Sequence, residues 1–132
     1  MINDPVNKIR RLQAQKEILM ERILTLQSSL ESAAINYDKI NVKTSARNSF
    51  EERMAELVDL KIELMNAELD CQRQIDQLLA ECQQTFDADQ MRILMFRIQG
   101  MTYAAIANRL YFSSARNVYR KYKRGLEKMD NV

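Results

Sequence analysis

Residues 87–129 read DADQMRILMFRIQGMTYAAIANRLYFSSARNVYRKYKRGLEKM, and three helical patterns follow one another closely in this stretch. The first pattern opens at Asp87, whose carboxylate suits an N-cap, and Gln90 stands three residues later, where a capping box needs it. Gly100 follows the last apolar residue of this pattern and is suited to a C-terminal glycine cap. The stretch therefore begins with a short helix that is capped at both ends.

Two more helices are expected in the rest of the stretch. A short helix starts from its N-cap Thr102, and a turn follows at residues 111–112. Ser113 or Ser114 then caps a final basic helix that reaches about Met129. A helix, a short helix, a tight turn and a basic helix form the layout of a helix-turn-helix DNA-binding unit.

The final helix has one apolar face and one basic face. At about 100° per residue, the apolar face suits packing on the preceding helices, and its members are Ala115, Val118, Tyr122, Leu126 and Met129. The N-terminal part of a recognition helix meets base edges in the major groove, where Arg pairs with guanine and Asn with adenine. Arg116, Asn117 and Arg120 are therefore the expected base readers. The alternative interpretation is a solvated basic face that the helix dipole favours.

Other candidate contacts are directed mainly at the phosphate backbone. Tyr119 could contact either a phosphate or a thymine methyl group. Core packing is the alternative role for Tyr103. The residues expected to contact phosphates, by their charge or their hydroxyl group, are Thr102, Tyr103, Ser113, Lys121, Lys123 and Arg124.

The composition restricts both the class of fold and the chemistry. The 132 residues include two Gly, one Pro and no His, whereas sheets joined by tight turns need Gly and Pro. An all-α fold is therefore expected. Phosphate-binding loops need clustered glycines, and Ser/His/Asp catalysis, Cys/His catalysis and His-based metal sites need histidine. We expect no enzyme, no cofactor and no metal site.

Charge is distributed unevenly along the chain. Residues 1–90 carry 11 basic and 16 acidic residues, and residues 91–132 carry 9 basic and 2 acidic residues, within a net charge of +2. This asymmetry predicts a basic module for a polyanion, attached to an acidic body. Cys71 and Cys82 are expected to be reduced, buried thiols of a cytoplasmic protein. We expect no membrane span and no signal peptide.

Residues 6–36 carry apolar residues in a 4–3 rhythm that predicts a long helix packed in coiled-coil fashion. The two rows of heptad positions hold Ile9, Lys16, Ile23, Leu30 and Tyr37, and Leu12, Leu19, Leu26, Ala33 and Ile40. Residues 37–49 are rich in Asn, Asp, Ser and Thr, and we expect a loop there. Ser49 is the expected N-cap of the next helix, and Glu52 would complete its capping box.

A second long helix is expected from about Phe50 to Gln83. One row of its heptad positions holds Phe50, Leu57, Leu64, Cys71 and Leu78, and the partner row holds Met54, Ile75 and Cys82. Lys61 and Glu68 interrupt the partner row. The apolar face is widened by a flanking row of Val58, Ile62, Met65, Leu69 and Leu79. So wide a face suggests contact with more than one neighbour.

Together these patterns predict a long antiparallel coiled-coil helical hairpin followed by a C-terminal helix-turn-helix domain. The hairpin is expected to span residues 1–84, and the DNA-binding domain residues 85–132. The hairpin would form a homodimer or a higher homo-oligomer, or bind another protein. A heptad pattern does not tell whether its partner helix lies in the same chain.

A family resemblance involves most of the chain and centres on QMRILMFRIQGMTYAAIANRL at residues 90–110 and RNVYRKYKRGLEKM at residues 116–129. These residues resemble the helix-turn-helix of the fourth region of bacterial sigma factors. With YDKI at 37–40 and NSFEERMAELVDLKIELMNAELDCQRQIDQLL at 48–79, the chain is similar to ArpU/RinA-like regulators of late transcription from phages and prophages. Members of that family usually have Gly where this chain has Tyr111. The resemblance implies an activator of late or packaging genes in the cytoplasm of a bacterial host cell.

The expected function is therefore that of a sequence-specific transcriptional regulator, encoded by a phage or another mobile element, with double-stranded DNA as its partner. Two alternatives stay open. The hairpin could contact RNA polymerase or a phage protein while the basic helix binds an acidic protein surface. Alternatively, the chain could be a DNA-packaging component that resembles a small terminase subunit.

Overall fold

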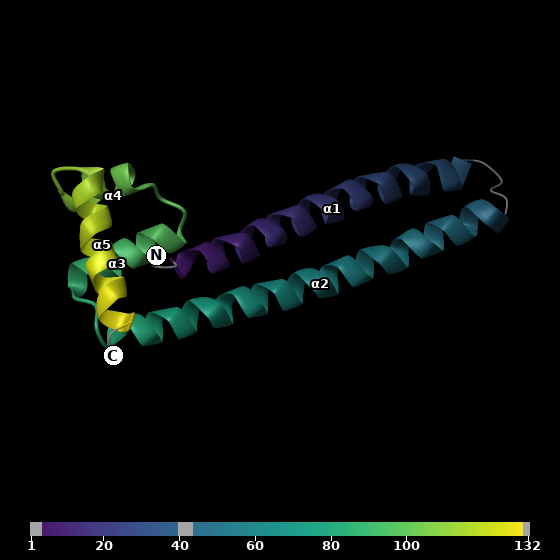
Figure 1. The fold of residues 1–132 in the computed structure, drawn as a ribbon. Coiled ribbons are helices and arrows are strands. Elements are labelled where there is room, and N and C mark those ends of the chain that lie inside the picture. The colour runs from purple at the N-terminus through teal and green to yellow at the C-terminus, as the bar shows by residue number, and fades with distance from the viewer. Residues whose placement is uncertain (1–3, 40–43, 131–132) are drawn as a thin grey trace. The chain divides into compact units, whose positions relative to one another are not determined.

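Two long helices and three short ones make up the part of the chain that the computed structural model describes, residues 4–39 and 44–130, with side chains described at 4–33 and 49–130. In chain order these helices are α1 (Val6–Lys39), α2 (Thr44–Gln83), α3 (Ala88–Ile98), α4 (Tyr103–Leu110) and α5 (Ala115–Asp130). α1 and α2 pack antiparallel as a hairpin, and the shorter helices follow (Figure 1). The predicted all-α fold is confirmed. None of the described helices has both the length and the apolar character needed to cross a membrane.

The middle of the hairpin, residues 13–70, forms one compact unit. Its buried core consists of Leu19, Ile23, Leu30, Leu57 and Leu60, and the partly buried Leu26, Phe50, Leu64 and Ala67 pack against it. Across the hairpin, the Arg53 guanidinium donates to the Ser29 hydroxyl at 3.2 Å. All of the buried core residues except Leu60 stand at predicted heptad positions, so the 4–3 rhythm identifies the face on which the helices meet.

The segment between α1 and α2 is more helical than the sequence predicts. Residues 37–39 belong to α1, and residues 44–49 belong to α2. The predicted loop over residues 37–49 is therefore wrong at both ends, and residues 40–43 lie outside the described residues. Asn, Ser and Thr cost less than about 1 kcal/mol each relative to Ala in a helix. Because the segment holds neither Gly nor Pro, its polar residues alone do not stop a helix.

The predicted start of the second helix is also wrong. Ser49 lies inside α2, beyond its first turn, so it is no N-cap and makes no capping box with Glu52. The heptad position predicted at Tyr37 falls among side chains that are not described, and the one at Ile40 lies outside the described residues.

A second compact unit joins the residues up to Leu12 with those from Cys71 onward. One hydrophobic core holds it together, and the buried members of this core are Val6, Ile9, Cys71, Leu78, Cys82, Phe86, Ile93, Leu94, Ile98, Ile106, Ala107, Val118, Tyr122 and Leu126. The start of α1 and the end of α2 therefore share a core with the three short helices. This division of the chain does not follow the predicted domain boundary between residues 84 and 85.

Both cysteines lie in the core of this second unit and are free thiols. Burial raises the pKa of the Cys82 thiol to about 11, and the charge of Glu81 adds to the effect. The Cys82 Sγ donates to the Met129 Sδ at 3.3 Å. Because the thiolate is the reactive form, Cys82 is a packing residue at neutral pH.

Candidate nucleic-acid interface

The predicted capping box fixes the start of α3. The Asp87 carboxylate accepts a hydrogen bond from the backbone N–H of Gln90 at 2.8 Å, and the backbone N–H of Asp87 donates to the Gln90 Oε1 at 2.9 Å. The Gln90 side chain is buried, and its amide also donates to the carbonyl oxygen of Lys121 at 3.0 Å. A single side chain therefore completes the cap of α3 and holds α5 against it.

The end of α3 is a Schellman motif around Gly100. The backbone N–H of Gly100 donates to the carbonyl of Arg97 at 3.0 Å, and that of Met101 donates to the carbonyl of Phe96 at 3.1 Å. Gly100 has a φ of +92°, which L side chains rarely adopt. The predicted glycine cap is confirmed, and it sets the direction in which the chain leaves α3 for α4.

The turn between α4 and α5 has a left-handed residue that is not glycine. Tyr111 has φ 61° and ψ 33°, and its side chain is 95% exposed. The backbone N–H groups of Tyr111 and Phe112 both donate to the carbonyl of Ala107, the latter at 2.9 Å. The Ser114 hydroxyl then accepts from the backbone N–H of Asn117 at 3.2 Å. Of the two predicted caps, Ser113 and Ser114, it is thus Ser114 that caps α5.

The inward face of α5 is the predicted one. Its residues are buried or half-buried, and they are Ala115, Val118, Tyr122, Leu126 and Met129. Gly125 is buried among them, and a Cβ built on it would lie 2.9 Å from the Phe86 Cε1. The missing side chain of Gly125 therefore lets α5 approach the Phe86 ring closely.

Tyr122 also contacts a residue from the start of the chain. Its hydroxyl donates to the Asp4 Oδ1 at 2.6 Å, and the same oxygen accepts from the backbone N–H of Val6 at 3.0 Å. The Arg97 guanidinium lies 3.6 Å from the other carboxylate oxygen of Asp4. Burial raises the pKa of the Tyr122 hydroxyl, and its bond to Asp4 adds to the effect. Sequence reasoning missed Asp4 and Arg97, and no local pattern connects them to Tyr122.

The outward face of α5 is exposed and basic. Its exposed candidate DNA contacts are Arg116, Asn117, Tyr119, Arg120, Lys123 and Arg124. From Arg116 to Arg124 this face extends about 12 Å along the helix, at 1.5 Å per residue. A hollow of about 280 Å³ lies on it, lined by Phe112, Asn117, Arg120, Lys121 and Arg124. The lining supplies guanidinium and amide donors that suit base edges and phosphates.

Lys121 is placed differently from its basic neighbours. It is half-buried, and its Nζ lies 2.9 Å from the Asp87 Oδ2. The pKa of the Asp87 carboxyl is lowered, first by the hydrogen bond from the Gln90 backbone and further by Lys121. The Lys121 ammonium group therefore stabilises the cap of α3 and is less free to reach a phosphate than the exposed Lys123.

Tyr103 is half-buried in a cluster of aromatic rings. The Arg97 guanidinium lies 4.5 Å from the centre of its ring, and the Tyr119 ring meets it edge to face at 5.5 Å. Burial raises the pKa of the Tyr103 hydroxyl. Tyr103 therefore takes part in packing, and its ring contacts that of the more exposed Tyr119.

Two hydroxyl groups predicted to bind phosphates already serve in local hydrogen bonds. The Thr102 hydroxyl accepts from the backbone N–H of Ala105 at 3.2 Å and caps α4, as predicted. The Ser113 hydroxyl accepts from the side-chain amide of Asn117. Both residues stay exposed, and Ser113 orients the amide that is expected to read a base.

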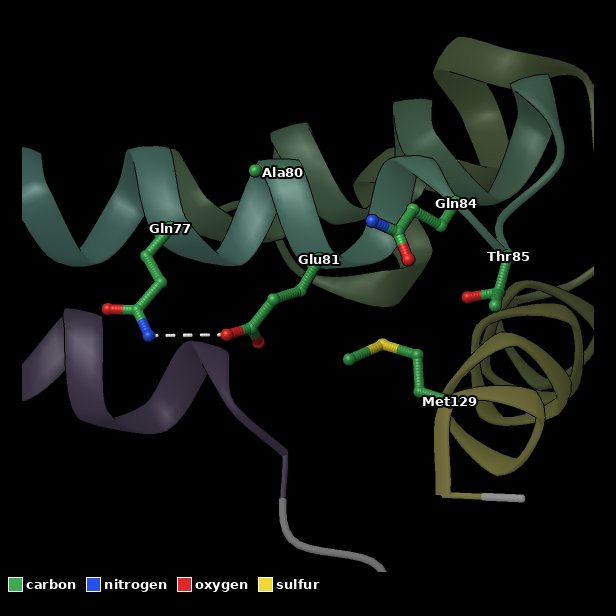
Figure 2. A pocket seen from close by; sticks show the side chains of 6 residues that line it. All are labelled: Gln77, Ala80, Glu81, Gln84, Thr85 and Met129. Carbon is green, nitrogen blue, oxygen red and sulfur yellow. Dashed lines mark hydrogen bonds between the residues drawn. The ribbon is translucent and has the colours of Figure 1, made fainter. Parts of the chain in front are cut away.

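A separate pocket of about 390 Å³ lies between the end of α2 and the end of α5 (Figure 2). It is lined by Gln77, Ala80, Glu81, Gln84, Thr85 and Met129. The Gln77 amide donates to the Glu81 carboxylate at 3.2 Å. No basic side chain lines this pocket, so its chemistry differs from that of the outward face of α5.

Across the described residues, no group of three or more His, Cys, Asp or Glu could hold a metal ion.

The resemblance to ArpU/RinA-like regulators and to the fourth sigma region stays a prediction. Comparisons of this chain with models of protein families, with curated proteins and with solved structures found no match.

Proposed function

We propose that this protein is a sequence-specific DNA-binding transcriptional regulator that places α5 in the major groove of double-stranded DNA. The observation that carries the proposal is the division of α5 into two faces. Val118, Tyr122 and Leu126 are 0%, 1% and 7% exposed, whereas Arg116 and Arg120 are exposed to solvent. The helix is thus packed through one side and presents Arg116 and Arg120 on the other.

The charge around this helix favours a polyanionic partner. From residue 90 to residue 126 the chain has eight Lys and Arg residues and no Asp or Glu. The nearby Asp87 carboxylate is paired with Lys121. The exposed positive charge is therefore not neutralised within its own segment and would attract the phosphate backbone of DNA.

The order of residues along α5 favours DNA over an acidic protein surface. The major groove is about 12 Å wide and admits one α-helix, whose first turns meet the base edges. Arg116, Asn117 and Arg120 occupy these turns and carry the side chains that pair with guanine and adenine. Lys123 and Arg124 lie farther along the helix, where phosphate contacts are expected.

The family resemblance extends the proposal from DNA binding to transcription. A regulator of late phage genes, working in the cytoplasm of a bacterial host, would need a sequence-selective contact of this kind. RNA polymerase or a second phage protein is a further candidate partner of such a regulator.

Selection of bound DNA from a random oligonucleotide pool with the full chain, followed by fluorescence anisotropy on the selected duplex, tests the proposal. We expect one enriched motif. The double variant Arg116→Ala/Arg120→Ala should bind that duplex about 100-fold more weakly, because each lost base contact costs about 1–3 kcal/mol. Arg10→Ala/Arg11→Ala is the matched control, because it removes the same charge from exposed positions of α1.

A salt titration separates base contacts from phosphate contacts. Lys123→Ala should weaken binding similarly on all sequences and reduce the slope of log K against log salt by about 0.9. Equal affinities of Arg116→Ala/Arg120→Ala and wild type, with circular dichroism unchanged, would contradict the proposed recognition helix. Absence of any nucleic-acid affinity would favour the protein-binding alternative.

A further inference from the structure

The compact unit over residues 13–70 leaves a row of apolar side chains on α2 exposed. This exposed row consists of Val58, Ile62, Met65 and Leu69, whose side chains are 54%, 51%, 62% and 60% exposed. Their 4–3–4 spacing places them on one face of α2 over about 16 Å. The buried Leu57 and Leu60 mark a different face, which is turned toward α1. Single exposed apolar residues are common, but a contiguous row is typical of an interaction surface.

Two opposite charges border the exposed row on the same side. Lys61 and Glu68 are both exposed, and at seven residues apart they lie about 10 Å from each other along the helix. Neither residue has an opposite charge three or four positions away on α2. These are the two residues that interrupt the heptad row of the hairpin, and at about 100° per residue they lie between the exposed row and the face turned toward α1.

We propose that a second copy of this chain covers the exposed row, with the two α2 helices antiparallel about a two-fold axis between Ile62 and Met65. In this register Val58 faces Leu69 of the second copy, and Ile62 faces Met65 of the second copy. An isologous contact of this kind buries the whole row of both copies at once.

The bordering charges select this partner and this orientation. Antiparallel pairing brings the same edge of both helices together, so Lys61 comes within about 3 Å along the axis of Glu68 of the second copy. The two-fold axis repeats the pair, which gives two Lys–Glu contacts. Parallel pairing in register would instead place this edge of the two copies on opposite sides of the contact, so Lys61 would not meet Glu68 of the second copy. The complementarity thus lies within one sequence and requires no other protein.

This inference does not depend on DNA binding, because the exposed row lies outside the unit that contains α5. A dimer would nevertheless carry two basic faces. The second would bind a duplex with two half-sites at a raised effective concentration once the first had bound.

Sedimentation velocity of the full chain over a concentration series, without DNA, tests the proposal. Wild type should show a monomer–dimer equilibrium. Ile62→Asp should raise the dimer dissociation constant about 100-fold or more, because it places a charge in an apolar contact. Ile18→Asp is the matched control, since Ile18 is 55% exposed on α1 of the same unit and lies outside the exposed row. Its dissociation constant should equal that of wild type.

Charge reversal tests the orientation. Lys61→Glu alone and Glu68→Lys alone should each weaken the dimer about tenfold, because each creates two like-charge contacts. The double variant Lys61→Glu/Glu68→Lys should restore the wild-type dissociation constant. The proposal is overturned by a monomeric wild type at submillimolar concentration, by an assembly larger than a dimer, by equal effects of the two isoleucine variants, or by a double variant that stays weak. Loss of DNA binding in a protein that still dimerises concerns only the proposed function.

Discussion

The two glycines are needed for different physical reasons. Gly100 has a backbone conformation that a side chain would strain, although a Cβ there would meet nothing within 4 Å. Gly125 has an ordinary helical backbone, but a Cβ there would meet the buried Phe86 ring. The reason for Gly100 could be predicted, because a helix end is a local signal. The Phe86–Gly125 contact joins residues far apart in the chain and could not be identified from spacing.

Gly125→Ala is therefore expected to destabilise the protein. In an open helix this change would add about 1 kcal/mol of stability. Here the new Cβ would overpack the core, which costs about 1–3 kcal/mol, so the free energy of unfolding should fall by about 1 kcal/mol. Urea denaturation measures the change, and Phe86→Leu/Gly125→Ala serves as the control. Gly125→Ala should lower the free energy of unfolding less in the Phe86→Leu background than in wild type. An equal loss in both backgrounds would show that the Phe86 ring is not what the new Cβ meets.

At the scale of the elements, helix ends with specific chemistry could be predicted and those without it could not. Asp87, Gly100 and Thr102 each make the predicted cap. The start of α2 at Thr44 was missed, because polar residues weaken a helix without ending it. On α5 the exposure of Arg116, Asn117 and Arg120 follows from helical spacing alone. The pairing of Lys121 with Asp87 depends on tertiary packing, which periodicity does not report.

Tyr111→Gly should stabilise the turn between α4 and α5. A left-handed conformation costs a residue with a Cβ about 1 kcal/mol, and glycine avoids most of this cost. Since Tyr111 is 95% exposed, its ring contributes little packing that could be lost. We expect a gain of about 0.5 kcal/mol in thermal or urea denaturation. A loss of stability would show that the Tyr111 ring makes contacts that outweigh the backbone strain.

The cap of α3 should depend on pH through Asp87. Its folded-state pKa is lowered, so ionised Asp87 stabilises the fold above the ordinary pKa of about 3.9. This stability is lost as the pH falls below 3.9 and through the folded-state pKa. Asp87→Asn keeps a capping oxygen but removes the charge that faces Lys121 and the helix dipole. It should cost about 0.5 kcal/mol at pH 7.

Urea denaturation of Asp87→Asn and wild type at neutral and strongly acidic pH checks this dependence. The difference between the two proteins should vanish in acid, because wild-type Asp87 is then protonated. A difference that persists unchanged in acid would mean that the charge of Asp87 does not stabilise the cap.

At the scale of the whole molecule, the unit that carries the basic face is discontinuous in sequence. Its described residues come from both sides of the hairpin segment 13–70. Asp4 links the start of α1 to Tyr122 of α5 and lies beside Arg97 of α3. Sequence patterns identified the elements of this unit correctly, but they placed its boundary at residue 84, because a linear pattern cannot show which distant segments share a core.

This discontinuity has a consequence for the order of events during translation. Asp4 is synthesised 118 residues before Tyr122, so the first turn of α1 must wait for α5 before its partner exists. The hairpin segment needs only residues that are adjacent in the growing chain and can close while synthesis continues. The hairpin segment is therefore complete before the basic face, which is fixed only after α5 has been synthesised.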